Sequence, residues 1–130
     1  MNETEPDRHL KPGELKHIRW EDVPCETLNP LLDRQLAVGK HIMVAHLRLK
    51  QDCVVPLHSH TNEQVSMIQS GALRFTLDGK DIVVRAGEIL CIPPDLPHSA
   101  VALEDTVAVD IFTPPREDWI NKTDQYLRSR

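Results

Sequence analysis

Hydrophobic and polar side chains alternate along most of this chain with a period of two. Between Met43 and Leu49 every second residue is apolar, with Val44, His46 and Arg48 in between. Because successive side chains of a strand point to opposite faces of a sheet, this pattern predicts a half-buried strand. Similar short runs follow at residues 65–69, 73–77, 82–84, 89–92, 99–103 and 106–112. The pattern therefore indicates a series of short strands.

Turn residues separate these runs. Asp78 and Gly79 lie between two β-rich runs, and an Asp-Gly pair favours a type I′ hairpin, in which both central residues need a positive φ. Ten prolines against five glycines indicate many short segments with stiff turns. Beyond Pro114 and Pro115, residues 116–127 are expected to form a short helix. This organisation predicts an all-β sandwich or barrel, and periodicity alone does not choose between an immunoglobulin-like sandwich and a jelly roll.

The length of 130 residues fits one compact domain. Residues 1–12 are polar and charged and are predicted to form a flexible arm, followed by a single domain over residues 13–130. The arm lacks the apolar core of a secretory signal, and three widely spaced cysteines fit reduced thiols, so we expect a cytoplasmic protein. Cys91 lies in an apolar run and is expected to be a small core residue.

The charge distribution limits the possible partners. The net charge is -5, and Lys and Arg form no cluster along the chain. Since proteins that bind nucleic acid usually carry a basic patch, a nucleic-acid partner is not expected. No apolar stretch has the length needed to cross a bilayer, so no membrane partner is expected either.

Four side chains have the spacing of a metal site. His58 and His60 are two residues apart, so on a strand both imidazoles point to the same face. Gln64 has the same parity, and His98 follows the proline-rich turn beyond the hairpin, on a strand that could run back beside them. Three imidazoles and an amide oxygen suit one divalent ion of manganese, iron, nickel or zinc, whereas structural zinc sites are closed and rich in cysteine. We therefore predict one divalent metal ion with open positions for water or substrate.

Two segments resemble the motifs of the cupin family. PLHSHTNEQVSMIQSGALRFTLDG (56–79) is similar to the first cupin motif and RAGEILCIPPDLPHSA (85–100) to the second. The resemblance implies a cupin double-stranded β-helix, or jelly-roll barrel, here with a short C-terminal helix. The third ligand of cupins is usually Glu, but Gln64 stands at that spacing, with Glu63 beside it. On an extended strand Glu63 would point away from the histidines, which favours Gln64. An amide in place of a carboxylate leaves the metal more positive, which favours an anionic substrate.

A second cluster of polar residues lies near the C-terminus. Asp110 and Phe112 share a strand face, so if Phe112 points into the barrel, Asp110 does too. A carboxylate among apolar neighbours tends to have a raised pKa, which suits a general acid or base. Arg116 could fold over the barrel mouth and bind a substrate carboxylate with two hydrogen bonds. A structural salt bridge between Asp110 and Arg116 is the alternative, and both interpretations stay open at this point.

The HSHTNEQ segment and the Asp-x-Phe-x-Pro-Pro-Arg tail together resemble the KdgF type of small cupin, which opens 4,5-unsaturated uronate monosaccharides to linear keto sugars. The resemblance implies that the metal is bound by His58, His60, Gln64 and His98, with catalytic Asp110, Arg116 and Phe112 beside it. We therefore expect a small anionic substrate, a sugar acid, and an enzyme of the isomerase type. The alternatives are a cupin that binds a small acid without catalysis and a metal-dependent dioxygenase.

Cupin barrels commonly pair, so the resemblance also implies a homodimer. Residues 18–23 are expected to supply an exchanged edge strand, because this would protect an open sheet edge.

Overall fold

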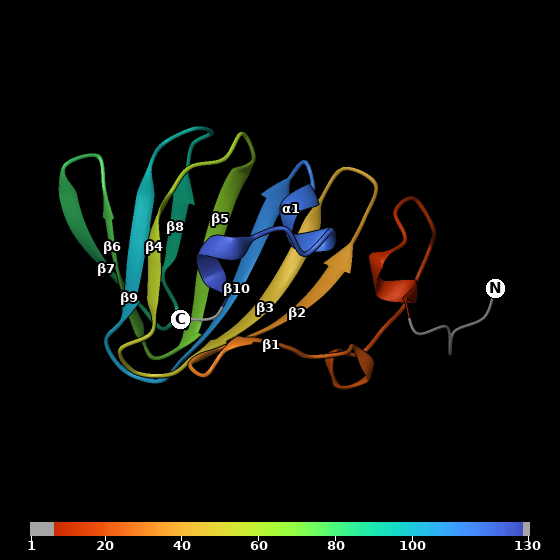
Figure 1. Ribbon diagram of the computed structural model, residues 1–130, viewed down its shortest axis with the longest axis horizontal. Helices are drawn as coiled ribbons and strands as arrows, with labels where there is room; N and C mark the ends of the chain where they lie inside the picture. The colour runs from red at the N-terminus through yellow and green to blue at the C-terminus, as the bar shows by residue number, and fades with distance from the viewer. Residues whose placement is uncertain (1–6, 129–130) are drawn as a thin grey trace.

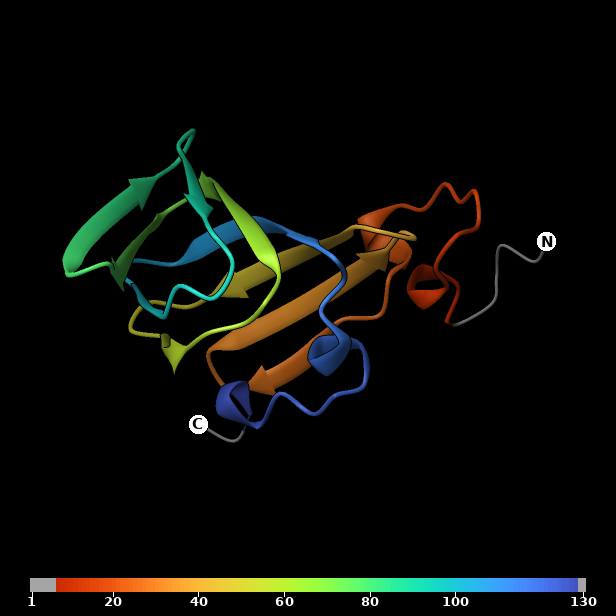
Figure 2. The same ribbon diagram turned by 90° about the horizontal axis from the view of Figure 1, so that it is seen from above.

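The computed structural model describes residues 7–128, in which the strands form two antiparallel sheets that face each other (Figures 1 and 2). In spatial order, the six-stranded sheet contains β1 (Glu26–Asn29), β2 (Leu32–Val38), β3 (Met43–Leu49), β10 (Thr106–Thr113), β5 (Glu63–Ser70) and β8 (Ile89–Ile92). The four-stranded sheet contains β4 (Val54–His58), β9 (His98–Ala102), β6 (Ala72–Leu77) and β7 (Lys80–Arg85). The predicted all-β jelly-roll class is confirmed.

The hydrophobic core lies between the two sheets. The alternating residues of β3 are buried as predicted, and on β10 Ala108 and Phe112 are fully buried. Each large apolar side chain contributes about 1.5–3 kcal/mol by leaving water. In β8 the parity is the reverse of what a core position for Cys91 requires: Ile92 is buried, whereas Ile89 and Cys91 are exposed. The prediction for Cys91 is therefore wrong, because a run of four apolar residues does not indicate which side of the strand faces inward.

The turns follow the local sequence. Asp78 has a φ of 52° and Gly79 a φ of 71°, as the predicted type I′ hairpin between β6 and β7 requires. Gly71, between β5 and β6, has a φ of 86°, and a Cβ atom there would collide with the backbone of Asp105 and Thr106. A side chain at position 71 would therefore push apart the strands that carry the site.

The C-terminal strap, which we define as residues 116–128, covers the open side between the sheets. It contains α1 (Glu117–Ile120) and the 3-10 helix η3 (Gln125–Leu127), so the predicted helix is divided into two short pieces. In Figures 1 and 2 the strap lies beside the six-stranded sheet, and its η3 contacts β4 of the other sheet. Asn29 Nδ2 donates to the carbonyl oxygen of Leu127 at 2.8 Å, which fixes the end of the strap.

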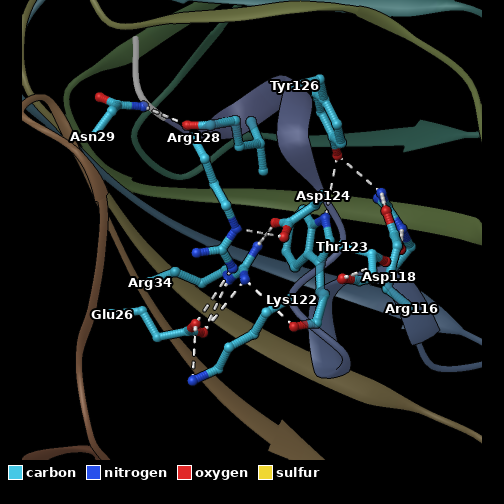
Figure 3. A network of polar contacts seen from close by, with 12 residues as sticks. Glu26, Asn29, Arg34, Arg116, Asp118, Lys122, Thr123, Asp124, Tyr126 and Arg128 are labelled. Carbon is cyan, nitrogen blue, oxygen red and sulfur yellow. Dashed lines mark hydrogen bonds and ion pairs between the residues drawn. The ribbon is translucent and has the colours of Figure 1, made fainter.

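A buried ionic network attaches the strap to β2 (Figure 3). Arg34 is completely buried, and its Nη1 donates to Oδ2 of the equally buried Asp124 at 2.6 Å. Its Nη2 lies 3.3 Å from Glu26, and its guanidinium lies over the Trp119 ring at 4.5 Å from the centroid. Arg128 Nε donates to the second oxygen of Asp124 at 3.0 Å. Both oxygens of the buried carboxylate are therefore paired, as an ion pair in a low dielectric requires.

The N-terminal segment packs on the six-stranded sheet. Residues 1–6 of the predicted flexible arm lie outside the described residues, but the 3-10 helix η1 (Arg8–Leu10) contacts β2 and buries Arg8 and His9. Residues 18–23, expected to form an exchanged strand, instead contain the 3-10 helix η2 (Trp20–Asp22). Gln35 Nε2 holds this segment by donating to the carbonyl oxygens of Trp20 and Val23. Among residues 7–128, no helix combines the length and the hydropathy needed to span a membrane.

Candidate metal centre

Three histidines, from β4, the loop after it and β9, meet at one end of the barrel. His58 ends β4, His60 lies in the loop that follows, and His98 begins β9 directly opposite His58 in the antiparallel register. Each ring offers a nitrogen, and these nitrogens lie within 4.8 Å of one another. One ion could therefore be held by all three, as the spacing in the sequence predicts.

Main-chain carbonyls fix the orientation of all three rings. Nδ1 of His58 lies 2.8 Å from the oxygen of Pro56, and Nδ1 of His98 lies 2.8 Å from the oxygen of Leu96. His60 has the same arrangement, with Nδ1 3.0 Å from the oxygen of Asn62. A carbonyl can only accept, so each Nδ1 carries the hydrogen and each Nε2 presents a lone pair. Metal-binding histidines are typically oriented in this way.

The amide of Gln64 adds a fourth possible ligand. Its Nε2 donates to Ser66 Oγ at 2.9 Å and lies 3.4 Å from Asp110 Oδ2, so its Oε1 is directed to His60 Nε2 at 3.1 Å. Because the hydrogen of His60 is on Nδ1, its Nε2 and the Oε1 of Gln64 are both acceptors and face each other. A cation between them removes the conflict. Glu63, the alternative considered above, is exposed on the other side of β5.

The site favours neutral imidazoles and a bound ion. Burial lowers the pKa of His58 and of His60 to about 4, and it also lowers the pKa of His98. Nε2 of His98 is buried without a hydrogen-bond partner among the described residues. Such an atom costs free energy unless something binds to it. The residues therefore fit a divalent metal ion.

His98→Ala tests the metal centre directly. We expect the variant to lose metal affinity by roughly 100-fold or more, since loss of a partner outside the ligand sphere alone costs about 10–100-fold. Metal content after dialysis, together with the rise in melting temperature on adding metal, measures the effect. His41→Ala, at an exposed position away from the cluster, is the matched control. Equal metal content in both variants would contradict the assignment.

Asp110 lies next to the histidine cluster, inside the barrel. It is only 6% exposed on β10, opposite Ser66 on β5. Burial raises its pKa to about 6, although a hydrogen bond from Ser66 and the charge of Arg116 act in the opposite direction. The expected inward orientation and raised pKa are thus found. A bound cation would shift this pKa downward.

Arg116 folds over the barrel as expected, and its ion-pair partner is not Asp110, the partner in the structural alternative. In the described part of the chain its ion pair is with Asp118, where Nε and Nη2 donate to the two carboxylate oxygens at 2.9 and 2.8 Å. A salt bridge from Arg116 to Asp110, the structural alternative above, is not formed. The guanidinium also lies 5.2 Å from the ring centroid of Phe112 and 4.7 Å from that of Trp119. The Phe112 ring thus packs against both the His60 ring and the Arg116 guanidinium.

Two hollows meet at this point. An inner cavity of about 50 Å³ has a mostly apolar wall, in which the polar groups are His58, Gln64, His98, Asp110, Arg116, Trp119 and Tyr126. An outer pocket of about 480 Å³ lies between the loop that carries His60 and the strap. Three side chains line both hollows, namely His58, Arg116 and Tyr126. The inner cavity has room for only a few waters, whereas the outer pocket has a size typical of small-molecule sites.

Sequence reasoning missed the residues that fix this arrangement. Tyr126 stacks on His58, with ring centroids 4.6 Å apart, and Asn62 donates to the carbonyl oxygen of Pro114 at 2.6 Å. Asp118 binds Arg116, and Ser66 orients Gln64. Ser66 could have been found from its parity with Gln64. No pattern in the sequence indicates that Tyr126 returns to the metal centre.

Comparison with known proteins agrees with this geometry. The family model described as Cupin domain matches residues 45–113, which is more than half of the chain and includes all three histidines. The chain belongs to the cupin family. Among curated protein sequences, none matches this cupin.

Solved structures share the fold. An RmlC-like cupin from Shewanella frigidimarina NCIMB 400 is 26% identical, with a TM-score of 0.76 over 82% of this cupin and 96% of that chain. KdgF from Halomonas sp. is 25% identical, with a TM-score of 0.72 over 76% and 94% of the two chains. A predicted oxalate decarboxylase from Thermotoga maritima, 17% identical with a TM-score of 0.69 over 77% and 100%, shows likeness of fold alone.

Proposed function

We propose that this cupin is a metal-dependent enzyme that opens the ring of a 4,5-unsaturated uronate or a related small sugar acid. The observation that carries the proposal is the shared cavity: its wall includes the candidate ligands His58, Gln64 and His98 together with Asp110 and Arg116. A Lewis-acid site, a buried carboxylate and a guanidinium are thus within one small volume. The similarity to KdgF from Halomonas supports the same reading.

The proposed reaction is an isomerisation and needs no co-substrate. The proton leaves the C1 hydroxyl, the C1–O5 bond breaks, and C1 becomes an aldehyde carbon. The electron pair goes to O5, the enolate collapses to a ketone at C5, and C4 takes up a proton. One proton is thus moved from oxygen to C4, and atoms and charge balance.

The residues of the chain divide these tasks. A divalent ion held by His58, His60, Gln64 and His98 would supply Lewis-acid stabilisation of the negative charge. Asp110 would carry the proton, since among residues 7–128 it is the only carboxylate in the wall of the inner cavity. Arg116 would bind and orient the substrate carboxylate. Phe112 would shield the site from water, consistent with its complete burial.

The size of the inner cavity adds a requirement. At about 50 Å³ it does not accommodate a sugar ring. The substrate must therefore enter through the outer pocket and extend past His58, Arg116 and Tyr126 to reach Asp110. Movement of the strap would open this route.

The test is a direct assay of purified protein loaded with Mn²⁺, Fe²⁺, Ni²⁺ or Zn²⁺. With 4,5-unsaturated galacturonate we expect accelerated loss of the enol-ether absorbance, which disappears in His98→Ala. Absence of acceleration with every one of these metals would refute the ring-opening proposal. Oxygen uptake with iron would then favour a dioxygenase, and binding without product a sensor of small acids.

We also propose a cytoplasmic homodimer. Cys25 and Cys91 are exposed thiols, which fits a reducing compartment. The outer face of the six-stranded sheet carries partly exposed Val65, Met67 and Ile111, an apolar surface that a second copy would cover. Light scattering during size exclusion should give twice the chain mass of 14.8 kDa. A single-chain mass at micromolar concentration would refute the dimer.

A further inference from the structure

The donors of Arg116 are only partly used within the described part of the chain. A guanidinium has five N–H donors, two on each Nη and one on Nε. Nε and one hydrogen of Nη2 go to Asp118, and Nη2 also donates to Tyr126 Oη at 2.9 Å. Nη1 is buried, with no hydrogen-bond partner among the described residues. Both N–H groups of Nη1 therefore remain without a partner among residues 7–128, in a side chain that is only 2% exposed and that lines both hollows.

The hydroxyl of Tyr126 is arranged in a complementary way. Its oxygen accepts from Arg116 Nη2 and also from Trp119 Nε1, at 3.2 Å. Neither of these donors can accept the hydroxyl hydrogen in return. Within residues 7–128 no acceptor takes the proton of this phenol, which is therefore left to donate. The hydroxyl lies close to the unused Nη1 because it is bonded to Nη2 of the same guanidinium. The Tyr126 ring, stacked on His58, holds the hydroxyl at the edge of the metal centre.

We propose that Tyr126 is a substrate-binding residue that, together with Arg116 Nη1, binds the carboxylate of the acid in the outer pocket. Nη1 donates to one carboxylate oxygen and the phenol donates to the other. The hydroxyl of Tyr126 thus links Nη2 to the carboxylate, since it accepts from Nη2 and donates to the ligand. Two adjacent donors match the two oxygens of a carboxylate. This inference deepens the proposed function, and it rests on that function only for the identity of the acid.

The arrangement selects for a carboxylate on a small neutral body. Asp118 already neutralises the Arg116 guanidinium, so the pair offers directed donors with little net charge. A divalent ion held by the histidines would supply the positive field. Pro114 and Pro115, which also line the outer pocket, offer apolar surface to the body of the ligand. A methyl ester, which lacks the second strong acceptor, should bind poorly.

Tyr126→Phe in the Zn²⁺-loaded protein tests this proposal, because the ring that stacks on His58 is kept and only the hydroxyl is lost. With D-galacturonate as the probe, we expect calorimetry to show binding at least 10-fold weaker than in wild type, with unchanged zinc content. Thr123→Val, which removes an exposed hydroxyl from the same strap, is the control and should bind as wild type does. The methyl ester of galacturonate should bind weakly to all three proteins.

A second readout needs no variant. The chain has one tyrosine, so protein labelled with ¹³C at the tyrosine Cζ gives a single resonance, which should shift when D-galacturonate binds. Equal affinity in Tyr126→Phe with an unmoved resonance would overturn the proposal, as would absence of galacturonate binding to wild type. If wild type turns over the unsaturated uronate and Tyr126→Phe is equally active, the role of Tyr126 is overturned and the ring-opening proposal still stands. Galacturonate binding that needs the hydroxyl, without any turnover, would refute only ring opening.

Discussion

Asp110→Asn should keep its metal and lose turnover by roughly 100-fold or more. Asparagine preserves the size of the side chain and can still pair with Gln64 and Ser66, so the orientation of the candidate ligand Gln64 is retained. It cannot take up and release a proton. The measurement is kcat for ring opening of 4,5-unsaturated galacturonate at saturating metal, together with the metal content of the variant.

The control for this variant is a carboxylate of the strap, Glu117, which does not line the inner cavity. Glu117→Gln removes an exposed carboxylate from the rim of the outer pocket, and metal content should be unchanged in both variants. If Asp110→Asn turns over as fast as wild type, Asp110 is not the proton carrier. A variant that loses metal together with activity would instead make Asp110 part of the metal centre.

Arg34→Ala should produce the largest loss of stability. Asp124 is fully buried, and its oxygen at 2.6 Å from Arg34 Nη1 would lose its partner. Removing one member of a buried ion pair costs about 3–5 kcal/mol, because the remaining charge stays buried without compensation. Thermal and denaturant unfolding measure this cost. Because Arg34 also packs on Trp119, we expect the strap to detach from β2 first, which would weaken galacturonate binding before the barrel unfolds.

An exposed ion pair provides the comparison. Arg19 pairs with Glu21 and Asp22 at the surface, with its side chain 68% exposed, so Arg19→Ala should change stability very little. If Arg34→Ala is equally mild, water must enter and solvate Asp124. The strap would then be held chiefly by Trp119 and Leu127, both of which are buried in the core.

The histidine cluster could be predicted only in part from local spacing. His58 and His60 are two residues apart, so a period of two indicates that both side chains lie on the same side of the chain. The place of His98 beside them depends on the pairing of β9 with β4, which a period of two does not give and which the resemblance to the cupin motifs indicated. The same parity argument placed Asp110 inside the barrel. The parity argument could not tell which side of β8 faces the core, because all four of its residues are apolar.

The strap could not be predicted because long-range contacts hold it. The pairs Arg34–Asp124 and Asn29–Leu127 join residues 90 and 98 positions apart, and neither has a local signature. The ion pair of Arg116 could not be predicted either. Strand parity drew attention to Asp110 as its possible structural partner, whereas Asp118, two residues away in α1, binds the guanidinium.

The position of Trp119 also gives the molecule an optical signal. Its indole ring is almost fully buried between the guanidinium groups of Arg34 and Arg116, and its N–H donates to Tyr126. Trp20, the other tryptophan, is partly exposed and its ring contacts that of His46 at a tilt, with centroids 5.3 Å apart. In a Trp20→Phe protein the intrinsic fluorescence would come from the strap alone. Opening of the outer pocket would then be visible as a change in emission, in real time and without an added dye.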